Sequence, residues 1–268
     1  MKNGLLGQDG RTVIVALDHA LASGQVAPLD DPKAILDKLL PAQPDGLILS
    51  YGMLKLLSHN APVQRWLTAD YYATSTLPGG SADLELQDRI WNADIAKWAG
   101  ASGLKVLLVF GRNRPEVHLR NIRNIAELVV EAAAVGLPVM VEPVLWGGAI
   151  LEQDKNDPNL IAHAARIAFE LGADVVKVPI PANLKALEAL TRKLPVPVLL
   201  MGGSATDPAR LFGLIQDAMD AGAAGVALGR NVWQYPNPVA MVKALQQLVH
   251  HGAKAEAALE ILHSGGQA

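Results

Sequence analysis

A single lysine interrupts one of the most apolar stretches of the chain, GADVVKVPIP at residues 172–181. Burying an unpaired ammonium group is costly, and a poorly solvated site lowers the pKa of a lysine. A neutral lysine amine can attack a carbonyl carbon and form a Schiff base. The alternative is a lysine that extends its ammonium group to the end of the strand and pairs with a carboxylate there. Lys177 is therefore either a nucleophile or a structural ion-pair partner.

Three other ionisable residues lie in comparable apolar runs. Glu142 stands in VMVEPV, Lys105 in GLKVLLVF, and Asp18 in VIVALDHA. Nothing else on these runs can satisfy a buried charge, so the four groups are expected to converge. Any one of them could belong to a structural ion pair, but the four together predict a catalytic site.

Elementary chemistry assigns roles to these groups. A second ammonium group, on Lys105, would disfavour the charged form of Lys177 and so promote nucleophilic attack. Glu142 could move the protons that dehydration of a carbinolamine and cleavage of a carbon–carbon bond require. Asp18 could hold a substrate hydroxyl group or balance the charge. His19 would point the other way along a regular strand, which predicts a structural or supporting role.

The elements that must position these residues alternate between short apolar runs and longer amphipathic ones. Several runs are continuously apolar, as expected when both faces of a parallel sheet are covered. Asp, Thr or Asn before proline marks several helix starts, and glycine after a helix marks several helix ends. The predicted strands are 12–18, 46–51, 71–76, 104–110, 138–144, 174–180, 197–203 and 225–231. The predicted helices are 82–99, 116–135, 158–171, 183–193, 207–221 and 238–250.

Eight strands in this alternation, with no linker or low-complexity segment, predict one α/β domain, a single (β/α)8 TIM barrel over residues 1–268. A doubly wound open sheet is the alternative. A short helical tail is expected from about residue 253. In a barrel of this kind the catalytic residues lie at the carboxyl ends of the strands. Lys105 stands early in its strand, so its side chain must reach up from the floor of the pocket.

Glycine-rich turns follow the last two predicted strands. The segment MGGSATDP contains Gly202, Gly203 and Ser204, and the segment LGRN contains Gly229 and Arg230. In phosphate-binding barrels the loops after these two strands offer backbone N–H groups to the anion, and an arginine can bind it with two hydrogen bonds. These five residues are therefore predicted to bind a phosphate group. The alternative is tight packing of the barrel with the arginine in solvent.

Composition excludes several other classes of protein. The net charge of −3 comes from interspersed acids and bases, so neither nucleic acid nor an anionic membrane surface is an expected partner. The chain has no cysteine, which removes disulfides and thiolate chemistry. The apolar run near the N-terminus is too short to span a membrane, so a cytoplasmic protein is expected. The seven histidines do not cluster with acidic residues at any strand end, so no metal is expected. No organic cofactor is expected either, because the nitrogen cation of a lysine Schiff base would itself serve as the electron sink.

Several segments resemble the superfamily of class I, Schiff-base-forming aldolases that act on deoxyribose phosphate, fructose bisphosphate and tagatose bisphosphate. VALDHA is similar to its first strand, GADVVKVPIP to the strand that carries the Schiff-base lysine, and residues 199–238 to its phosphate-binding end. GLKVLLV and VMVEPV resemble the tagatose-bisphosphate aldolases and their sulfofructose-phosphate relatives. The resemblance implies that Lys177 is the nucleophile and Glu142 the acid and base, with Asp18 and Lys105 as supporting charges.

Three positions depart from patterns seen in the superfamily. Val144 stands where archaeal-type fructose-bisphosphate aldolases place an acid–base tyrosine, so that version of the mechanism is not expected here. Met201 replaces a frequent serine before the paired glycines, and Ala205 replaces a frequent lysine after them. Phosphate binding is then expected to depend on backbone groups, Ser204 and Arg230.

The resemblance implies a metal-independent class I aldolase for a phosphorylated ketose, acting as a homo-oligomer. Related activities remain as alternatives: a lysine-dependent thiolase for a phosphorylated autoinducer-2 product, or a transaldolase-like synthase of an aromatic precursor. A barrel that binds a sugar phosphate without catalysis is an alternative of another class. The loops that distinguish substrates carry no readable signature.

Overall fold

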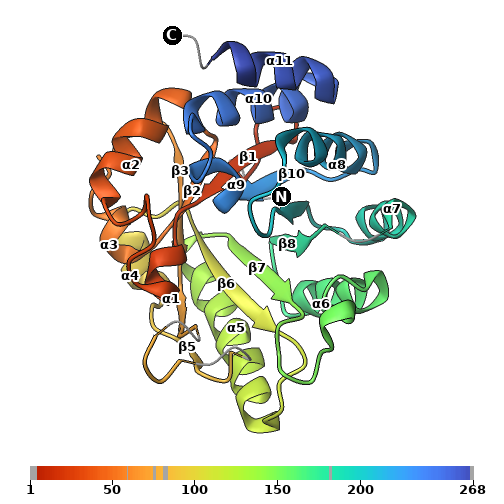
Figure 1. Ribbon diagram of the computed structural model, residues 1–268. Coiled ribbons are helices and arrows are strands. Elements are labelled where there is room, and N and C mark those ends of the chain that lie inside the picture. The colour runs from red at the N-terminus through yellow and green to blue at the C-terminus, as the bar shows by residue number, and fades with distance from the viewer. Residues whose placement is uncertain (1–4, 59, 75–76, 81–83, 181–182, 266–268) are drawn as a thin grey trace.

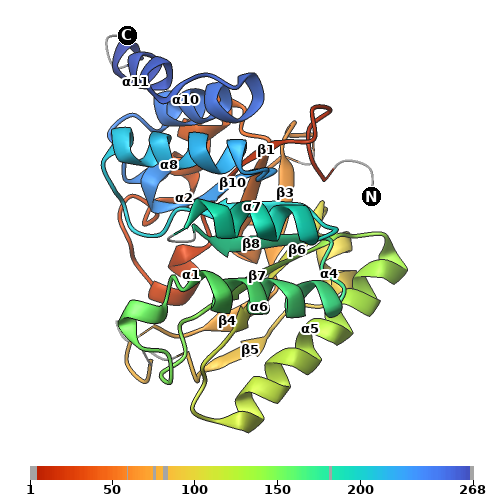
Figure 2. The same cartoon turned by 90° about the vertical axis from the view of Figure 1, so that its right-hand side faces the viewer.

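Eight parallel strands form a closed barrel, and helices between them cover its outside (Figures 1 and 2). The computed structural model describes residues 5–58, 60–74, 77–80, 84–180 and 183–265. The order around the barrel is β1-β10-β9-β8-β7-β6-β3-β2. The barrel strands are β1 (Thr12–Ala16), β2 (Gly46–Leu49), β3 (Gln64–Thr68), β6 (Gly103–Val109), β7 (Val139–Val144), β8 (Val175–Pro179), β9 (Val198–Met201) and β10 (Gly225–Leu228). The predicted TIM barrel is confirmed.

The helices follow the pattern of caps read from the sequence. The side chains of Asp31, Asp157, Asp207 and Asn237 each accept a backbone N–H at the start of a helix whose first residue is proline. The longer helices are α2 (Pro32–Leu39), α5 (Pro115–Val135), α6 (Pro158–Glu170), α7 (Leu184–Lys193), α8 (Pro208–Asp220), α10 (Pro238–His251) and α11 (Ala255–Ser264). The short ones are α1 (His19–Ser23), α3 (Tyr51–Leu54), α4 (Ala93–Trp98) and α9 (Arg230–Trp233), with 3-10 turns η1 (Leu40–Ala42) and η2 (Glu152–Asp154).

Two apolar layers hold the barrel together. One lies between the strands and the surrounding helices, and the other fills the barrel interior with residues such as Ile14, Trp66 and Met140. The Trp66 indole needs glycine on the neighbouring strand, because a Cβ at Gly103 would lie 2.6 Å from its ring. The interior is thus packed below the carboxyl ends of the strands, which leaves the barrel mouth for the site.

The third barrel strand differs from the prediction. It is β3, at Gln64–Thr68, and not residues 71–76, of which 75–76 lie outside the described residues. Only the second half of this strand is buried, and its first two residues, Gln64 and Arg65, are polar. The strand therefore lacks the apolar run by which the other strands were recognised. Trp66 and Leu67 supply the burial on its two faces. A strand needs apolar residues only where it packs, and in β3 this part is only three residues long. The alternation of inward-facing and outward-facing residues was therefore too short to detect in the sequence.

Two short strands between β3 and α4 form a separate pair outside the barrel. Strands β4 (Asp70–Tyr72) and β5 (Gln87–Arg89) are antiparallel, with Tyr72 opposite Gln87. The helix predicted over 82–99 is therefore wrong in its first half, of which 82–83 lie outside the described residues. The helix begins only where the Asn92 side chain accepts the Ile95 N–H. We call the two strands β4 and β5 together the β4–β5 ribbon.

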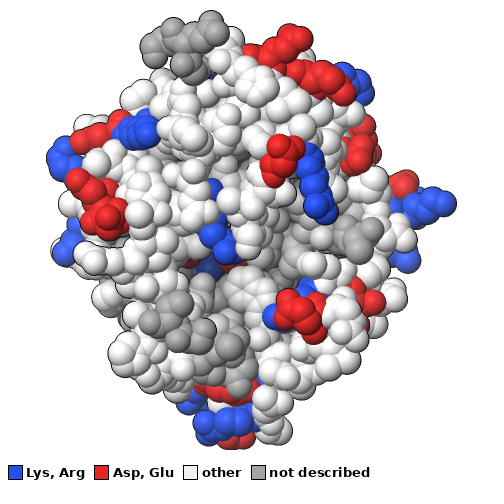
Figure 3. Space-filling model, viewed as in Figure 1, with Lys and Arg blue, Asp and Glu red and all other residues white. Residues whose placement is uncertain are grey.

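The surface carries acidic and basic side chains side by side, as Figure 3 shows for the face that contains the barrel mouth. None of the helices in the described part of the chain combines the length and apolarity that a membrane-crossing segment needs. Helix α11, at the position of the expected tail, packs on α8 and α10.

An ionic clip joins α10 to the amino-terminal end of the barrel. The His250 ring lies 2.7 Å from an Asp9 carboxylate oxygen through Nδ1 and 2.8 Å from Asp45 Oδ2 through Nε2. Asp45 Oδ2 also accepts the N–H of Val13 in β1 at 2.6 Å. Burial alone would lower the pKa of His250, but the two carboxylates outweigh burial and raise it.

We expect the clip to stabilise the fold in a pH-dependent way. Because the folded-state pKa of His250 is raised, the contribution of its charged ring to the free energy of unfolding is complete at a pH below the ordinary pKa of 6.5. That contribution is lost as the pH rises through the folded-state pKa. Changing His250→Gln should lower the free energy of unfolding by about 1–2 kcal/mol at pH 5.5 and by less at pH 9. Urea denaturation of the variant beside His251→Gln, an exposed neighbour, measures this. A loss that grows with pH would contradict it.

Candidate active site

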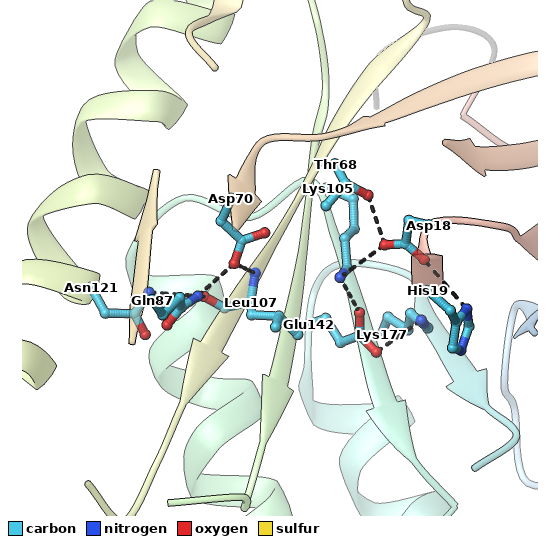
Figure 4. A network of polar contacts seen from close by, with 10 residues as sticks. All are labelled: Asp18, His19, Thr68, Asp70, Gln87, Lys105, Leu107, Asn121, Glu142 and Lys177. Atoms are coloured by element: carbon cyan, nitrogen blue, oxygen red, sulfur yellow. Dashed lines mark hydrogen bonds and ion pairs between the residues drawn. The ribbon is translucent and has the colours of Figure 1, made fainter. Parts of the chain in front are cut away.

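Lys105, Glu142 and Lys177 face the barrel interior, because successive side chains of a strand point alternately inward and outward. Lys105 lies opposite Met140 in the β6–β7 register, and Leu107 lies opposite Glu142. Lys105 therefore stands one layer below Glu142 and reaches up toward the mouth, as the sequence predicts. Lys177, in β8, points into the same space (Figure 4).

Glu142 bridges the two lysines. Its Oε1 lies 2.8 Å from Lys177 Nζ, and its Oε2 lies 2.9 Å from Lys105 Nζ. The three side chains are between 4 and 7 % exposed. Both charges of such a pair must find partners when water is removed, and here one carboxylate serves two ammonium groups. The glutamate is thus at hydrogen-bonding distance from the amine that it would deprotonate.

Asp18 completes the cluster from the end of β1. Its Oδ2 accepts a hydrogen bond from the Thr68 hydroxyl group at 2.7 Å and lies 3.5 Å from Lys105 Nζ. Two carboxylates and two ammonium groups then meet in one buried space, with a formal charge of zero when all are ionised. Thr68 was not predicted, because its short strand was missed.

Mutual contact, more than solvation, sets the charge states of this cluster. Burial alone would raise the pKa of Asp18 and of Glu142, but the Lys105 ammonium group lowers both below their ordinary values. Burial alone would lower the pKa of Lys105, yet Glu142 and Asp18 raise it well above its ordinary value. Lys105 is therefore a fixed positive charge, and both carboxylates are ionised at neutral pH.

A cavity at the barrel mouth joins the cluster to the glycine-rich turns, and Figure 3 shows charged atoms inside this hollow. Gly202, Gly203, Gly229 and Arg230 contribute to its wall, on the β9 and β10 side. Ser204 does not line the cavity and lies on the exposed part of the turn. The remaining lining residues are Ala16, Asp18, His19, Tyr72, Lys105, Leu107, Glu142, Trp146, Lys177, Met201 and Ala227.

A buried asparagine connects the two turns. The Asn231 side-chain amide donates to the carbonyl oxygens of Gly202 and Ser204, and its Oδ1 accepts the N–H of Thr206 at 2.9 Å. The turn after β9 is therefore held in place by the residue that follows Arg230. The sequence places this asparagine next to the phosphate motif, but its role depends on contacts between two strands and was not predicted.

His19 departs from the expectation that it points away from the site. Strand β1 ends at Ala16, so Asp18 and His19 lie in the turn and at the start of α1, where side chains no longer alternate. The ring lines the cavity, packs against the Trp233 ring in a T-shaped contact, and has its Nδ1 3.7 Å from Asp18 Oδ1. A Cβ at Gly229 would lie 2.3 Å from this ring, so a larger residue there would displace the ring.

The described residues contain no group of three or more His, Asp or Glu side chains arranged to hold a metal ion. The site instead offers a buried amine, a carboxylate that touches it, and an arginine beside two glycine-rich turns. This combination, at the carboxyl ends of barrel strands, defines a class of enzyme that reacts through a lysine amine with an anionic carbonyl compound.

The chain belongs to the DeoC/LacD family of aldolases, whose family model matches residues 12–235. It is 32 % identical over 263 residues to a class 1 fructose-bisphosphate aldolase of Halobacterium salinarum, covering 95 % of this chain and 96 % of that protein. It is 30 % identical over 258 residues to 3-hydroxy-5-phosphonooxypentane-2,4-dione thiolase of Shigella flexneri, covering 96 % and 95 %.

Among solved structures, an archaeal fructose-1,6-bisphosphate aldolase with its catalytic lysine bound to a carbinolamine intermediate superimposes with a TM-score of 0.81. The two chains are 26 % identical over 92 % of this chain and 96 % of the other.

We expect the cluster to be strongly coupled to stability. Changing Lys105→Met leaves Glu142 and Asp18 short of a counter-charge and should lower the free energy of unfolding by about 3–5 kcal/mol at pH 7. Because the folded-state pKa values of Glu142 and Asp18 are lowered, the two carboxylates stabilise the fold fully at a pH above their ordinary pKa values of 4.5 and 3.8. This stabilisation is lost as the pH falls through the folded-state pKa values. The deficit should therefore shrink in acid.

Urea denaturation between pH 3 and 7 measures this effect. Arg166→Met, which breaks an exposed ion pair with Glu170, is the control and should change little at any pH. A loss for Lys105→Met no larger than that of the control would mean that the cluster is not held together by its charges.

Proposed function

We propose that the chain is a class I aldolase that cleaves or forms a carbon–carbon bond of a phosphorylated ketose. The observation that carries the proposal is the 2.8 Å contact between Lys177 Nζ and Glu142 Oε1, in a cavity whose neighbouring wall contains Arg230 and the paired glycines. The membership of the aldolase family and the likeness to fructose-bisphosphate aldolases support it.

The first stage is formation of the Schiff base. Glu142 takes a proton from Lys177, and the neutral amine attacks the ketone carbon to form a carbinolamine. The hydroxyl group of the carbinolamine then receives a proton from Glu142 and leaves as water. The product is an iminium ion in which the nitrogen cation can accept an electron pair. The cation of Lys105, on the far oxygen of Glu142, keeps the carboxyl group oriented for both transfers.

The second stage is the aldol cleavage. A base removes the proton from the hydroxyl group β to the iminium carbon, and we assign this step to Glu142. The bond between the α and β carbons breaks, its electron pair forms an enamine with the iminium nitrogen, and the β carbon leaves as an aldehyde. Protonation of the enamine and hydrolysis by water release the ketone. Asp18 is positioned to hold a hydroxyl group of the substrate beside Lys105.

Phosphate recognition is assigned to the turns after β9 and β10. The Arg230 side chain lines the cavity beside Gly229, and its buried Nε has no hydrogen-bond partner among the described residues. The backbone of Gly202 and Gly203, held by Asn231, faces the same space. Ser204 would join these groups only if its turn moved toward the cavity, since its side chain is exposed in this structure.

A lysine-dependent thiolase is the second candidate, favoured by the 30 % identity to the Shigella flexneri thiolase. It would retain Lys177 but deliver the cleaved acyl fragment to a thiol of the coenzyme A type. Dependence of turnover on coenzyme A separates the two activities, because an aldolase needs only its substrate and water.

We also propose that the protein acts in the cytoplasm as a homo-oligomer. Phosphorylated sugars are intracellular metabolites, and the chain carries no cysteine. Val130 on α5 is 71 % exposed and Trp98 on α4 is 79 % exposed, as expected for side chains that a second copy could cover. Light scattering of the purified protein tests the assembly, and a monomeric mass would contradict it.

Activity assays on ketose bisphosphates test the proposed reaction. The wild-type protein should release an aldehyde and a ketone phosphate from at least one substrate, at a rate unaffected by EDTA. Lys177→Met should abolish turnover, and Glu142→Gln should lower kcat by about 100- to 10,000-fold because the proton carrier is lost. Release that requires coenzyme A would favour the thiolase, and full activity of Lys177→Met would contradict both candidates.

Arg230 should affect binding of the phosphorylated substrate. Changing Arg230→Met removes the guanidinium group that would donate hydrogen bonds to the phosphate group, so KM for the ketose phosphate should rise about 10- to 100-fold. Inorganic phosphate should inhibit the wild-type protein competitively and the variant more weakly. Arg210→Met, on the exposed surface of α8, is the matched control. Equal inhibition of both variants by phosphate would place the anion elsewhere.

A further inference from the structure

Strand β6 extends beyond the end of its neighbour β3. The β3–β6 register ends with Thr68 opposite Lys105, whereas β6 continues to Val109. The backbone groups of Leu107 and Val109 on that edge would be unpaired and buried without another partner. Something else must satisfy them, and the side chains that do so come from the β4–β5 ribbon and from α5.

Asp70 and Gln87 attach the ribbon to this edge (Figure 4). The buried Asp70 carboxylate accepts the Leu107 N–H at 3.2 Å and a hydrogen bond from the Gln87 amide. Gln87 also donates to the Leu107 carbonyl oxygen at 3.3 Å. Asn121 of α5 donates to the same carbonyl and accepts the Val109 N–H at 3.0 Å. The ribbon is thus fixed to the strand that carries Lys105.

The attachment places Tyr72 in the cavity. Tyr72 lies opposite Gln87 in the β4–β5 ladder, and its side chain lines the space that contains Lys105, Glu142 and Lys177. Its ring packs against an apolar cluster that includes Leu107 and Val144. No hydrogen bond of the Tyr72 hydroxyl group is formed with any residue that the structure describes, so this polar group is available to a ligand.

The order of strands sets the place of Tyr72 relative to the phosphate turns. Around the ring of eight strands, the gap between β6 and β3 lies directly across from the gap between β9 and β10. Tyr72 follows β3 and is fixed to β6, while Gly202 and Arg230 follow β9 and β10. Lys177 and Glu142 lie between the two sides, on β8 and β7. A substrate anchored at the turns therefore passes the reacting amine before it reaches Tyr72.

We infer that Tyr72 is a specificity-determining residue whose hydroxyl group donates a hydrogen bond to a hydroxyl or carbonyl oxygen of the substrate half distant from the phosphate turns. This inference rests on the proposed aldolase function. The residue contacts the part of the ketose beyond the bond that breaks, which is the part in which sugars epimeric at the β carbon differ. Burial raises the pKa of the phenol well above its ordinary value, so the group remains a neutral donor.

The test compares Tyr72→Phe with Tyr71→Phe. Adjacent strand residues face opposite ways, and Tyr71 lines a separate surface groove with Pro78, Leu86 and Arg120. Tyr72→Phe should lower kcat/KM for the preferred ketose bisphosphate by about 10- to 100-fold, and should reduce discrimination against its epimer. Tyr71→Phe should behave as the wild type. An unchanged kcat/KM and unchanged discrimination in Tyr72→Phe would overturn the inference.

Trapping with dihydroxyacetone phosphate and borohydride separates this inference from the proposed function. The ketone lacks the distant half, so Tyr72→Phe should form the reduced adduct at the wild-type rate. A slower adduct in Tyr72→Phe, with an unchanged melting temperature, would assign Tyr72 to the common half and overturn the inference. If the wild-type protein forms no adduct, the proposed function fails. The inference then depends on Kd for the ketose bisphosphate, and an equal Kd in Tyr72→Phe and wild type would overturn it.

Discussion

Two ammonium groups and two carboxylates share one water-poor space at the mouth of this barrel, and each is tolerated there only because the others are present. Lys105 sits one residue layer below Glu142 and contacts both carboxylates, so it works as a fixed counter-charge. Lys177 contacts only one carboxylate, that of Glu142, and lines the cavity in which a substrate would bind. The same contacts that make the charges tolerable place a carboxylate against the nucleophile, so stability and proton transfer depend on one arrangement.

The unequal lengths of neighbouring strands produce the second half of the site. Because β6 extends beyond the end of β3, the backbone groups on the unpaired edge of β6 require hydrogen-bond partners. Asp70 and Gln87 supply these partners from outside the barrel. The ribbon that satisfies the backbone also carries Tyr72 into the cavity, opposite the glycine-rich turns. A local backbone constraint thereby determines which side chain faces the far end of a bound ligand.

Sequence reasoning reached the barrel and the four charged residues because both depend on local patterns. Continuous apolar runs mark buried parallel strands, and a charged residue inside such a run is conspicuous. The third strand was placed at residues 71–76 instead of Gln64–Thr68 because only half of the true strand is buried. That misplacement concealed Thr68 and left the position of Tyr72 in the cavity unpredicted. Asn231, and the entry of His19 into the cavity, depend on where strands end and on contacts between distant turns. The periodicity of apolar residues does not reveal such contacts. The helix N-caps at Asp–Pro and Asn–Pro, by contrast, depend on neighbouring residues and were predicted from the sequence.

The central claim is that Lys177, and not the neighbouring Lys105, forms the covalent intermediate. The most direct measurement is peptide mapping by mass spectrometry after borohydride reduction of the protein mixed with dihydroxyacetone phosphate. The account predicts a reduced adduct on the peptide that contains Lys177, with Lys105 unmodified because its ammonium group is held charged by two carboxylates. An adduct on Lys105, or an adduct that persists at full yield in Lys177→Ala, would contradict it.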